Sequence, residues 1–131
     1  MTTKIERLID ANLNRLREAL RLLEDIERYI YNNRDLSKAF KELRHKLTPL
    51  FNSSRLEFRD IEGDVSKESI DSEMKRDSLS DLIDANFSRA TESARVLEEA
   101  FKLTDQKASA TAKEVRYTLY NLQILVYKQS I

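Results

Sequence analysis

Six arginines of the chain are suited to binding phosphate: Arg15, Arg44, Arg59, Arg76, Arg89 and Arg116. A guanidinium group presents parallel N–H donors that hold phosphate oxygens in pairs. Asp60 and Asp64 stand on either side of Gly63 and add two carboxylates, the ligands that Mg²⁺ prefers beside a phosphate. Taken singly, these charges are better interpreted as solvated side chains. As a set, they predict a site for a phosphorylated small molecule, with Asp60 and Asp64 as magnesium ligands.

Other kinds of site lack the residues that they need. The chain has no cysteine, one histidine and one glycine, which excludes thiolate chemistry and a glycine-rich phosphate loop. Glu42-x-x-His45 has the spacing of a di-iron ligand pair, but such a site needs two pairs, and Tyr117 stands where the second histidine would be. No serine, histidine and aspartate have the spacing of a nucleophilic triad.

The chain contains an internal repeat at an offset of 74 residues. Between 8–25 and 82–99, ten positions are identical: Leu8, Ile9, Asp10, Ala11, Asn12, Arg15, Glu18, Arg21, Leu23 and Glu24 recur at plus 74. Lys41-Glu42-Leu43-Arg44 is echoed by Lys113-Glu114-Val115-Arg116. The repeated unit is therefore a helical hairpin, present twice.

At 100° per residue, Asn12 lies at the centre of the apolar face of the first helix, with Arg15 and Glu18 on its shoulder. The second copy repeats this arrangement with Asn86, Arg89 and Glu92. A buried asparagine that fixes helix register, with ordinary surface ion pairs, explains one copy. Two inward-facing copies favour a polar pocket between the helices.

Capping residues and apolar spacing predict four long helices. The first begins at the capping box Thr3-x-x-Glu6 and ends near Tyr31, and Asp35 caps the second. Pro49 should kink the second helix or mark its final turns. Between residues 53 and 77 the apolar residues no longer recur at helical spacing, apart from a short helical turn expected between Lys67 and Met74.

The third helix begins after Ser78-x-x-Asp81 and ends near Thr104, and the fourth continues to the C-terminus. We therefore expect an all-α fold: a four-helix bundle of two pseudo-symmetric helical hairpins joined by a long crossover loop. Residues 1–131 form one domain, with repeat 1 at 3–52, the crossover at 53–77 and repeat 2 at 78–131. The order of the crossover without ligand is not fixed by the sequence.

The charges balance, with 23 basic and 23 acidic residues, so there is no overall positive charge of the kind that drives nucleic-acid binding. No signal peptide and no apolar run near the length of a membrane span is present. We expect a cytoplasmic protein that binds small molecules rather than nucleic acid or membrane, and the sequence leaves a homo-oligomer open.

Longer motifs carry a family resemblance. They are Arg59-Asp60-x-x-Gly63-Asp64-Val65, Arg76-x-Ser78, Ala85-Asn86-x-x-Arg89-x-x-Glu92-x-x-Arg95, and Asp10-Ala11-Asn12-x-x-Arg15-x-x-Glu18. With Leu43-Arg44-His45 they resemble the short all-helical hydroxymethylpyrimidine phosphate kinase family of thiamine biosynthesis. Its members occur alone or fused to thiamine phosphate synthase, and are sometimes labelled thiamine phosphate pyrophosphorylase. Ser66 departs from the glycine that is common there.

The resemblance implies a kinase that transfers the γ-phosphoryl group of ATP, with Mg²⁺, to hydroxymethylpyrimidine monophosphate. A phosphate acceptor needs no general base, so arginines and a carboxylate-held Mg²⁺ suit this reaction. As catalytic residues we expect Arg59, Asp60, Asp64 and Arg89. As residues that bind substrate or phosphate we expect Asn12, Arg15, Glu18, Arg44, Arg76, Asn86, Glu92 and Lys102. Glu18 and Glu92 would orient the two arginines, while Arg95 and Glu98 fall on the outer helix face.

Two other functions remain open. One is a non-catalytic accessory domain of thiamine phosphate synthase, which predicts exposed apolar patches and no turnover by the chain alone. The other is an arginine-lined helical enzyme of the chorismate mutase type, which would bind a dicarboxylate without nucleotide or Mg²⁺.

Overall fold

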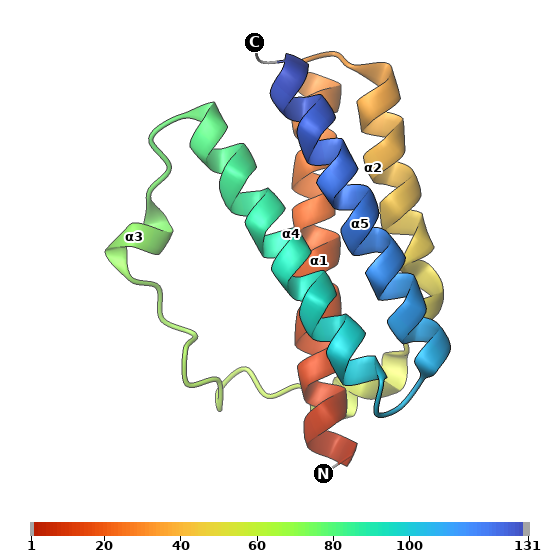
Figure 1. Ribbon diagram of the computed structural model, residues 1–131. Helices are drawn as coiled ribbons and strands as arrows, with labels where there is room; N and C mark the ends of the chain where they lie inside the picture. The colour runs from red at the N-terminus through yellow and green to blue at the C-terminus, as the bar shows by residue number, and fades with distance from the viewer. Residues whose placement is uncertain (1, 130–131) are drawn as a thin grey trace.

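The computed structural model describes residues 2–129, without the side chains of 71 and 72, and this part of the chain contains no β-strand. The elements in chain order are α1 (Thr2–Tyr29), α2 (Arg34–Lys46), η1 (Thr48–Leu50), η2 (Ser53–Phe58), α3 (Asp71–Met74), α4 (Leu79–Phe101) and α5 (Gln106–Gln129). The predicted all-α fold is confirmed, because four long helices form a bundle with the two hairpins as its halves (Figure 1).

Each long helix packs against two others. α1 packs against α2 and α4, and α5 packs against α4 and α2, which closes the ring. α1 and α4 run side by side in opposite directions (Figure 1). The pseudo-two-fold axis that relates the two hairpins therefore passes between α1 and α4.

The core explains why the helices pack closely. Leu16, Ala90, Ala94 and Leu119 are among the side chains with no exposed surface, and alanines let neighbouring helices approach. Phe40 of α2 meets Phe87 of α4, with ring centroids 5.8 Å apart, so the two hairpins share one core. Burying such an aromatic side chain contributes roughly 2–3 kcal/mol.

The connection between α1 and α2 differs in detail from the prediction. α1 ends at Tyr29, and Asn32 takes a left-handed conformation with φ 52°, which asparagine tolerates. Asn33, rather than the predicted Asp35, caps α2, because its side chain accepts a hydrogen bond from the Leu36 N–H. α4 ends at Phe101, earlier than the predicted end near Thr104. Ser78 caps α4 as predicted, because its hydroxyl oxygen accepts a hydrogen bond from the Asp81 N–H.

The crossover is anchored at its start. η2 packs against α1, and Arg55 reaches both Glu6 of α1 and the carbonyl oxygen of Leu50. Arg59 then pairs with Asp10 of α1. Beyond this point the chain runs away from the bundle through α3 and returns to the start of α4 (Figure 1).

Candidate functional site

The two repeated asparagines bond to their own helices. Asn12 is 3% exposed, and its Nδ2 donates to the carbonyl oxygen of Leu8 at 3.0 Å. The half-buried Asn86 donates to Leu82 at 2.9 Å. This i to i−4 bond satisfies an amide that would otherwise be costly to bury. The buried position of Asn12 was predicted, and in both asparagines the side-chain nitrogen donates to the backbone of its own helix.

Arg15, Arg89, Glu18 and Glu92 do not face inward, so that expectation was wrong. All four side chains are exposed, and none forms an ion pair or hydrogen bond with the described residues. Their long charged ends reach water from the edge of the apolar face, which is the lower-energy arrangement for unpaired charges. Because α1 and α4 are antiparallel neighbours (Figure 1) and the repeat relates them by a pseudo-two-fold axis, we infer that Arg15 and Arg89 lie on the same side of this helix pair.

We call the surface formed by Arg15, Glu18, Arg89 and Glu92 the α1–α4 face. These residues are identical in the two halves of the repeat, although their side chains are exposed and form no ion pair with the described residues. Repeated residues that the fold does use, such as Asn12, have visible partners. Among the described residues, the charged groups of the α1–α4 face are therefore without ion pairs, and their role in ligand binding stays a prediction.

Arg59 lies at the edge of this face. Its Nε and a terminal nitrogen donate to the two carboxylate oxygens of Asp10, both at 2.8 Å. This hydrogen-bonded pairing, opposed by desolvation and helped by the negative charges of Asp10 and Glu18, raises the pKa of Arg59. Arg7 adds a hydrogen bond to the Asp60 carbonyl oxygen at 2.9 Å, so the crossover is fastened along α1.

Arg44 has a structural partner. It binds Glu24 of α1, with 3.0 Å between Nε and Oε1. The equivalent residues of the second hairpin, Arg116 and Glu98, form the same pair. Glu98 is 6% exposed, so its predicted place on the outer face was wrong. Lys102 is exposed and donates to Glu99 at 2.8 Å.

The crossover carboxylates act as turn acceptors. Asp60 accepts from the Gly63 N–H at 2.7 Å, and Asp64 accepts from the Ser66 N–H at 2.9 Å. Arg76 donates to the carbonyl oxygens of Glu73 and Lys75. Within residues 2–129, no three histidine, aspartate or glutamate side chains lie together in a cluster that could hold a metal ion by itself. Asp60 and Asp64 as magnesium ligands stay a prediction.

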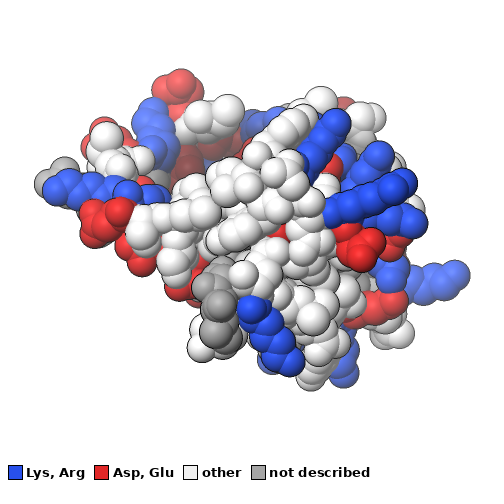
Figure 2. Space-filling model, turned by 90° about the horizontal axis from the view of Figure 1, so that it is seen from above, with Lys and Arg blue, Asp and Glu red and all other residues white. Residues whose placement is uncertain are grey.

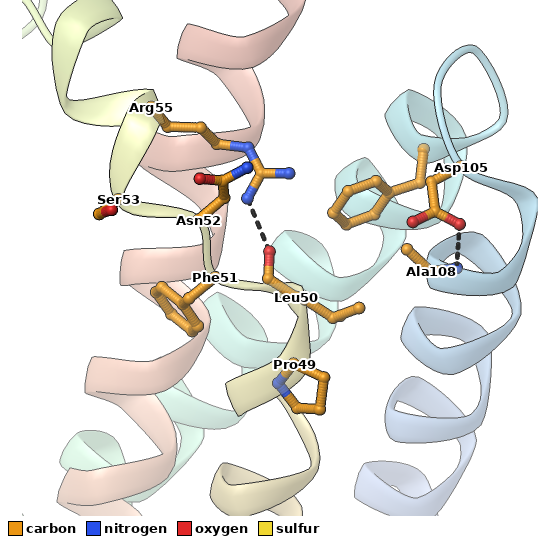
Figure 3. Close-up of a pocket in the computed structure, with 9 residues that line it drawn as sticks. Pro49, Leu50, Phe51, Asn52, Ser53, Arg55, Asp105 and Ala108 are labelled. Carbon is orange, nitrogen blue, oxygen red and sulfur yellow. Dashed lines mark hydrogen bonds between the residues drawn. The ribbon is translucent and has the colours of Figure 1, made fainter.

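A cavity of about 410 Å³ lies at the end of the bundle where the crossover begins, between the segment after α2 and the α4–α5 turn (Figure 3). Its cation, Arg55, donates to the Leu50 carbonyl oxygen at 2.6 Å and binds Glu6. Asp105 accepts from the Ala108 N–H at 3.1 Å and so begins α5. The polar groups of this cavity have structural roles and hold the crossover to the bundle.

We did not predict from the sequence the apolar surface that α5 presents. Tyr117, Tyr120, Ile124 and Tyr127 follow one another at spacings of three and four residues, and we call them the α5 apolar stripe. Tyr117 is 53% exposed and Tyr127 is 68% exposed. A cavity of about 510 Å³ between α4 and α5 is lined by Tyr120, Ile124 and Tyr127. The spacing was visible in the sequence, but only the packing shows which face is left uncovered.

Comparison with known proteins identifies the family. The model of the ThiD2 family matches residues 7–124. The chain belongs to the ThiD2 family. Its place in thiamine biosynthesis, which the sequence motifs predicted, is thereby confirmed, and the match gives no support to a chorismate mutase type of enzyme.

Curated relatives of this ThiD2 chain are named thiamine-phosphate synthase. That of Synechocystis sp. is 39% identical over 122 residues, which are 92% of this chain and 36% of that protein. That of Nostoc punctiforme is 37% identical over 120 residues, which are 91% of this chain and 34% of that protein. The chain thus spans about a third of the length of these relatives. No solved structure matches it.

These names correct the predicted activity. A synthase that forms thiamine phosphate is a transferase, but it is not a kinase with a phosphate acceptor, so the hydroxymethylpyrimidine phosphate kinase assignment and ATP as co-substrate are wrong. We had interpreted the arginines, which suit phosphate binding, as evidence for phosphoryl transfer, but a protein can bind a phosphate group without transferring it.

Within the described residues, no helix is both long and apolar enough to span a membrane.

Proposed function

We propose that this chain is a helical accessory domain of thiamine-phosphate synthase, which supports the synthase without turning over substrate by itself. The observation that carries this proposal is that 92% of the chain corresponds to only 36% of the Synechocystis synthase. The larger remainder of such a protein has room for a separate catalytic domain. In these relatives the segment that matches this chain is one part of a larger polypeptide.

The α5 apolar stripe is the surface through which the domain would contact the synthase. Three tyrosines and an isoleucine lie exposed on one helix, and the adjoining cavity can receive an apolar side chain from the partner. Tyrosine is enriched at protein interfaces because it contributes a large rigid area with a polar end. The proposed occupant is the catalytic domain of the synthase, not a second copy of this chain.

The α1–α4 face would hold a phosphorylated ligand of the synthase reaction. Arg15 and Arg89 are exposed cations without partners, related by the repeat, and both are suited to bidentate contact with phosphate. Asp60 and Asp64 would hold Mg²⁺ near that phosphate if the crossover rearranged on binding. The charged residues would then increase the local concentration of substrate for the catalytic domain.

Complex formation tests this proposal. The part of the Synechocystis synthase outside the matched segment is titrated with this chain and followed by calorimetry and light scattering. A one-to-one complex is expected, and Ile124→Lys should weaken it at least about tenfold, the effect of losing one buried apolar anchor. Ile61→Lys, the same change at an exposed apolar residue of the crossover, is the control and should leave the affinity unchanged.

Formation of thiamine phosphate gives the second readout. Adding this chain to the isolated catalytic part should raise its rate, and Ile124→Lys should remove that effect. An unchanged rate together with no complex would refute the accessory function. Formation of thiamine phosphate by this chain alone would also refute the accessory function, because it would show that the chain itself is catalytic.

A further inference from the structure

The cavity of about 510 Å³ between α4 and α5 adjoins the α5 apolar stripe and carries one negative charge. We call it the α4–α5 pocket, and its lining residues include Ser80, Ile83, Asp84, Tyr120, Ile124 and Tyr127. Among the described residues that line it, Asp84 is the only one with a charge. Seen from the end of the bundle where α4 begins and α5 ends, uncharged side chains occupy the centre of the surface (Figure 2). The pocket is therefore an apolar and aromatic cavity with a single carboxylate.

The first half of the chain covers the corresponding surface of α1 with its own arginines. After α2 the chain continues through η1 and η2, and η2 packs against α1. Arg55 pairs with Glu6, and Arg59 donates to both carboxylate oxygens of Asp10 at 2.8 Å. Two acidic residues of α1 are thus held by guanidinium groups from the segment that follows α2.

The second half leaves the equivalent surface of α4 without such a segment. Ser80 and Asp84 stand at plus 74 from Glu6 and Asp10. α5 is one long helix where the first half has α2, η1 and η2 in succession. Asp84 is exposed and forms no ion pair or hydrogen bond with the described residues. The second half therefore repeats the carboxylate of this arrangement without the guanidinium group that binds it.

The aromatic rings of the pocket suit the same kind of cation. Tyr120 is 43% exposed and Tyr127 is 68% exposed, and the face of a tyrosine ring attracts a guanidinium group. Arg116 lies 5.9 Å from the ring of Tyr120, but Glu98 binds it and neutralises its charge. An apolar side chain would fill the pocket and leave its carboxylate without a partner. An arginine can stack on a ring and pair with a carboxylate together, which a lysine does less well.

We propose that the α4–α5 pocket receives an arginine side chain of the catalytic domain of the synthase, in the way that α1 receives the arginines of η2 and the residues after it. This inference rests on the proposed accessory function and adds the chemical class of the contact. The guanidinium group would pair with Asp84, and the apolar stem of the arginine would lie against Ile124. A second copy of this chain is the less favoured source, because Arg55 and Arg59 are already bound within their own chain.

A small arginine compound tests the pocket without the partner. N-acetylarginine methylamide and its citrulline analogue, which has the same shape without the charge, are titrated into the protein. The amide resonances of α4 and α5 are followed by NMR. We expect saturable shifts around Asp84 and Ile124, with the arginine compound bound at least about fivefold more tightly than the citrulline compound. Added salt should reduce this preference. Equal affinities for the two compounds would overturn the proposal.

Variants of α4 show whether Asp84 carries the preference. Asp84→Asn should abolish it, whereas Asp84→Glu, which keeps the carboxylate, should retain most of it. Glu92→Gln removes an exposed, unpaired carboxylate from the same helix outside the pocket, and should leave the preference unchanged. An equal effect of Glu92→Gln and Asp84→Asn would mean that the arginine compound responds only to the total charge of the helix, and would overturn the proposal.

The complex with the catalytic part of the Synechocystis synthase tests the source of the arginine. Asp84→Asn should weaken this complex at least about fivefold, and Glu92→Gln should leave it unchanged. A complex that Asp84→Asn does not affect would overturn this inference and leave the accessory function intact. No complex, together with selective binding of the arginine compound, would refute the accessory function and the synthase as the source. Light scattering of this chain alone supplies the last outcome, because a dimer that Asp84→Asn disrupts would identify a second copy as the occupant and overturn the proposal.

Discussion

Arg116 donates two hydrogen bonds to one carboxylate oxygen of Glu98, at 3.1 and 2.8 Å, and so joins α5 to α4. Arg44 and Glu24 make the equivalent link between α2 and α1, at 3.0 and 3.4 Å. The Arg116 guanidinium also meets Tyr120, and the hydrogen bonds to Tyr120 and Glu98 raise the pKa of Arg116. The two hairpins are thus fastened by the same ion pair at equivalent positions.

Removing one partner of the more buried pair should destabilise the protein. Glu98→Ala leaves the Arg116 guanidinium largely buried without its partner, and we expect a loss of about 3 kcal/mol in the free energy of unfolding. Urea denaturation measures this loss. Glu92→Ala, at an exposed glutamate of the same helix without an ion pair, is the control and should cost less than about 0.5 kcal/mol. Equal losses in the two variants would contradict a structural role for the pair.

Breaking the Asp10–Arg59 pair should loosen the crossover without unfolding the bundle. Asp10→Asn removes the charge that holds Arg59, a partly buried contact worth roughly 1 kcal/mol, so global stability should change little. Trypsin cleavage after Arg59, Lys67 and Lys75 should become several times faster. Asp84→Asn, at the repeat-equivalent exposed residue, should leave the cleavage rate as it is. An unchanged rate in Asp10→Asn would show that η2 alone anchors the crossover.

Glu27 should make the stability of the protein depend on pH. The side chain is 1% exposed, and burial raises its pKa above the ordinary 4.5 although the hydrogen bonds from Gln129 partly oppose this. Between the unfolded and the folded pKa, the folded state keeps a proton that the unfolded state has released. The free energy of unfolding therefore falls as pH rises through that window, by about 1.4 kcal/mol for each unit that separates the two values.

Glu27→Gln should remove this contribution, since the substituted amide does not titrate. Unfolding free energies measured from pH 4 to pH 7 should fall less in Glu27→Gln than in the wild type. Glu92→Gln, at an exposed glutamate, should follow the wild-type curve. Identical curves for the wild type and Glu27→Gln would mean that folding does not shift the pKa of Glu27.

Arg15 and Arg89 should matter for ligand binding and not for folding. Arg15→Ala with Arg89→Ala removes two exposed side chains without partners, so the free energy of unfolding should change by less than about 0.5 kcal/mol. Binding of thiamine phosphate, measured by calorimetry, should weaken at least about tenfold if these guanidinium groups hold its phosphate. Arg21→Ala, which breaks only a pair with Asp25 on α1, is the matched control. Unchanged affinity in the double variant would remove the α1–α4 face from the proposed function.

Much of the fold followed from the sequence because helix spacing and caps are local. The Ser78 cap, the four long helices and the burial of Asn12 were predicted from neighbouring residues alone. The cap of α2 was assigned to Asp35 and proved to be Asn33, because the conformation of Asn32 sets where the new helix begins. Residues at the edge of the apolar face were the least predictable: Arg15 reaches solvent, whereas Glu98 is drawn inward by Arg116.

By itself the sequence determined the all-helical fold, the duplicated hairpin and the motifs of thiamine biosynthesis, since spacing and repetition are properties of the chain. Tertiary structure decided which charges have partners. Arg44 and Arg116 meet a glutamate across a helix interface, while Lys38 and Lys41 stand unpaired in a groove. The physical reason is that an ion pair depends on the distance between two helices, which residue spacing within one helix does not specify.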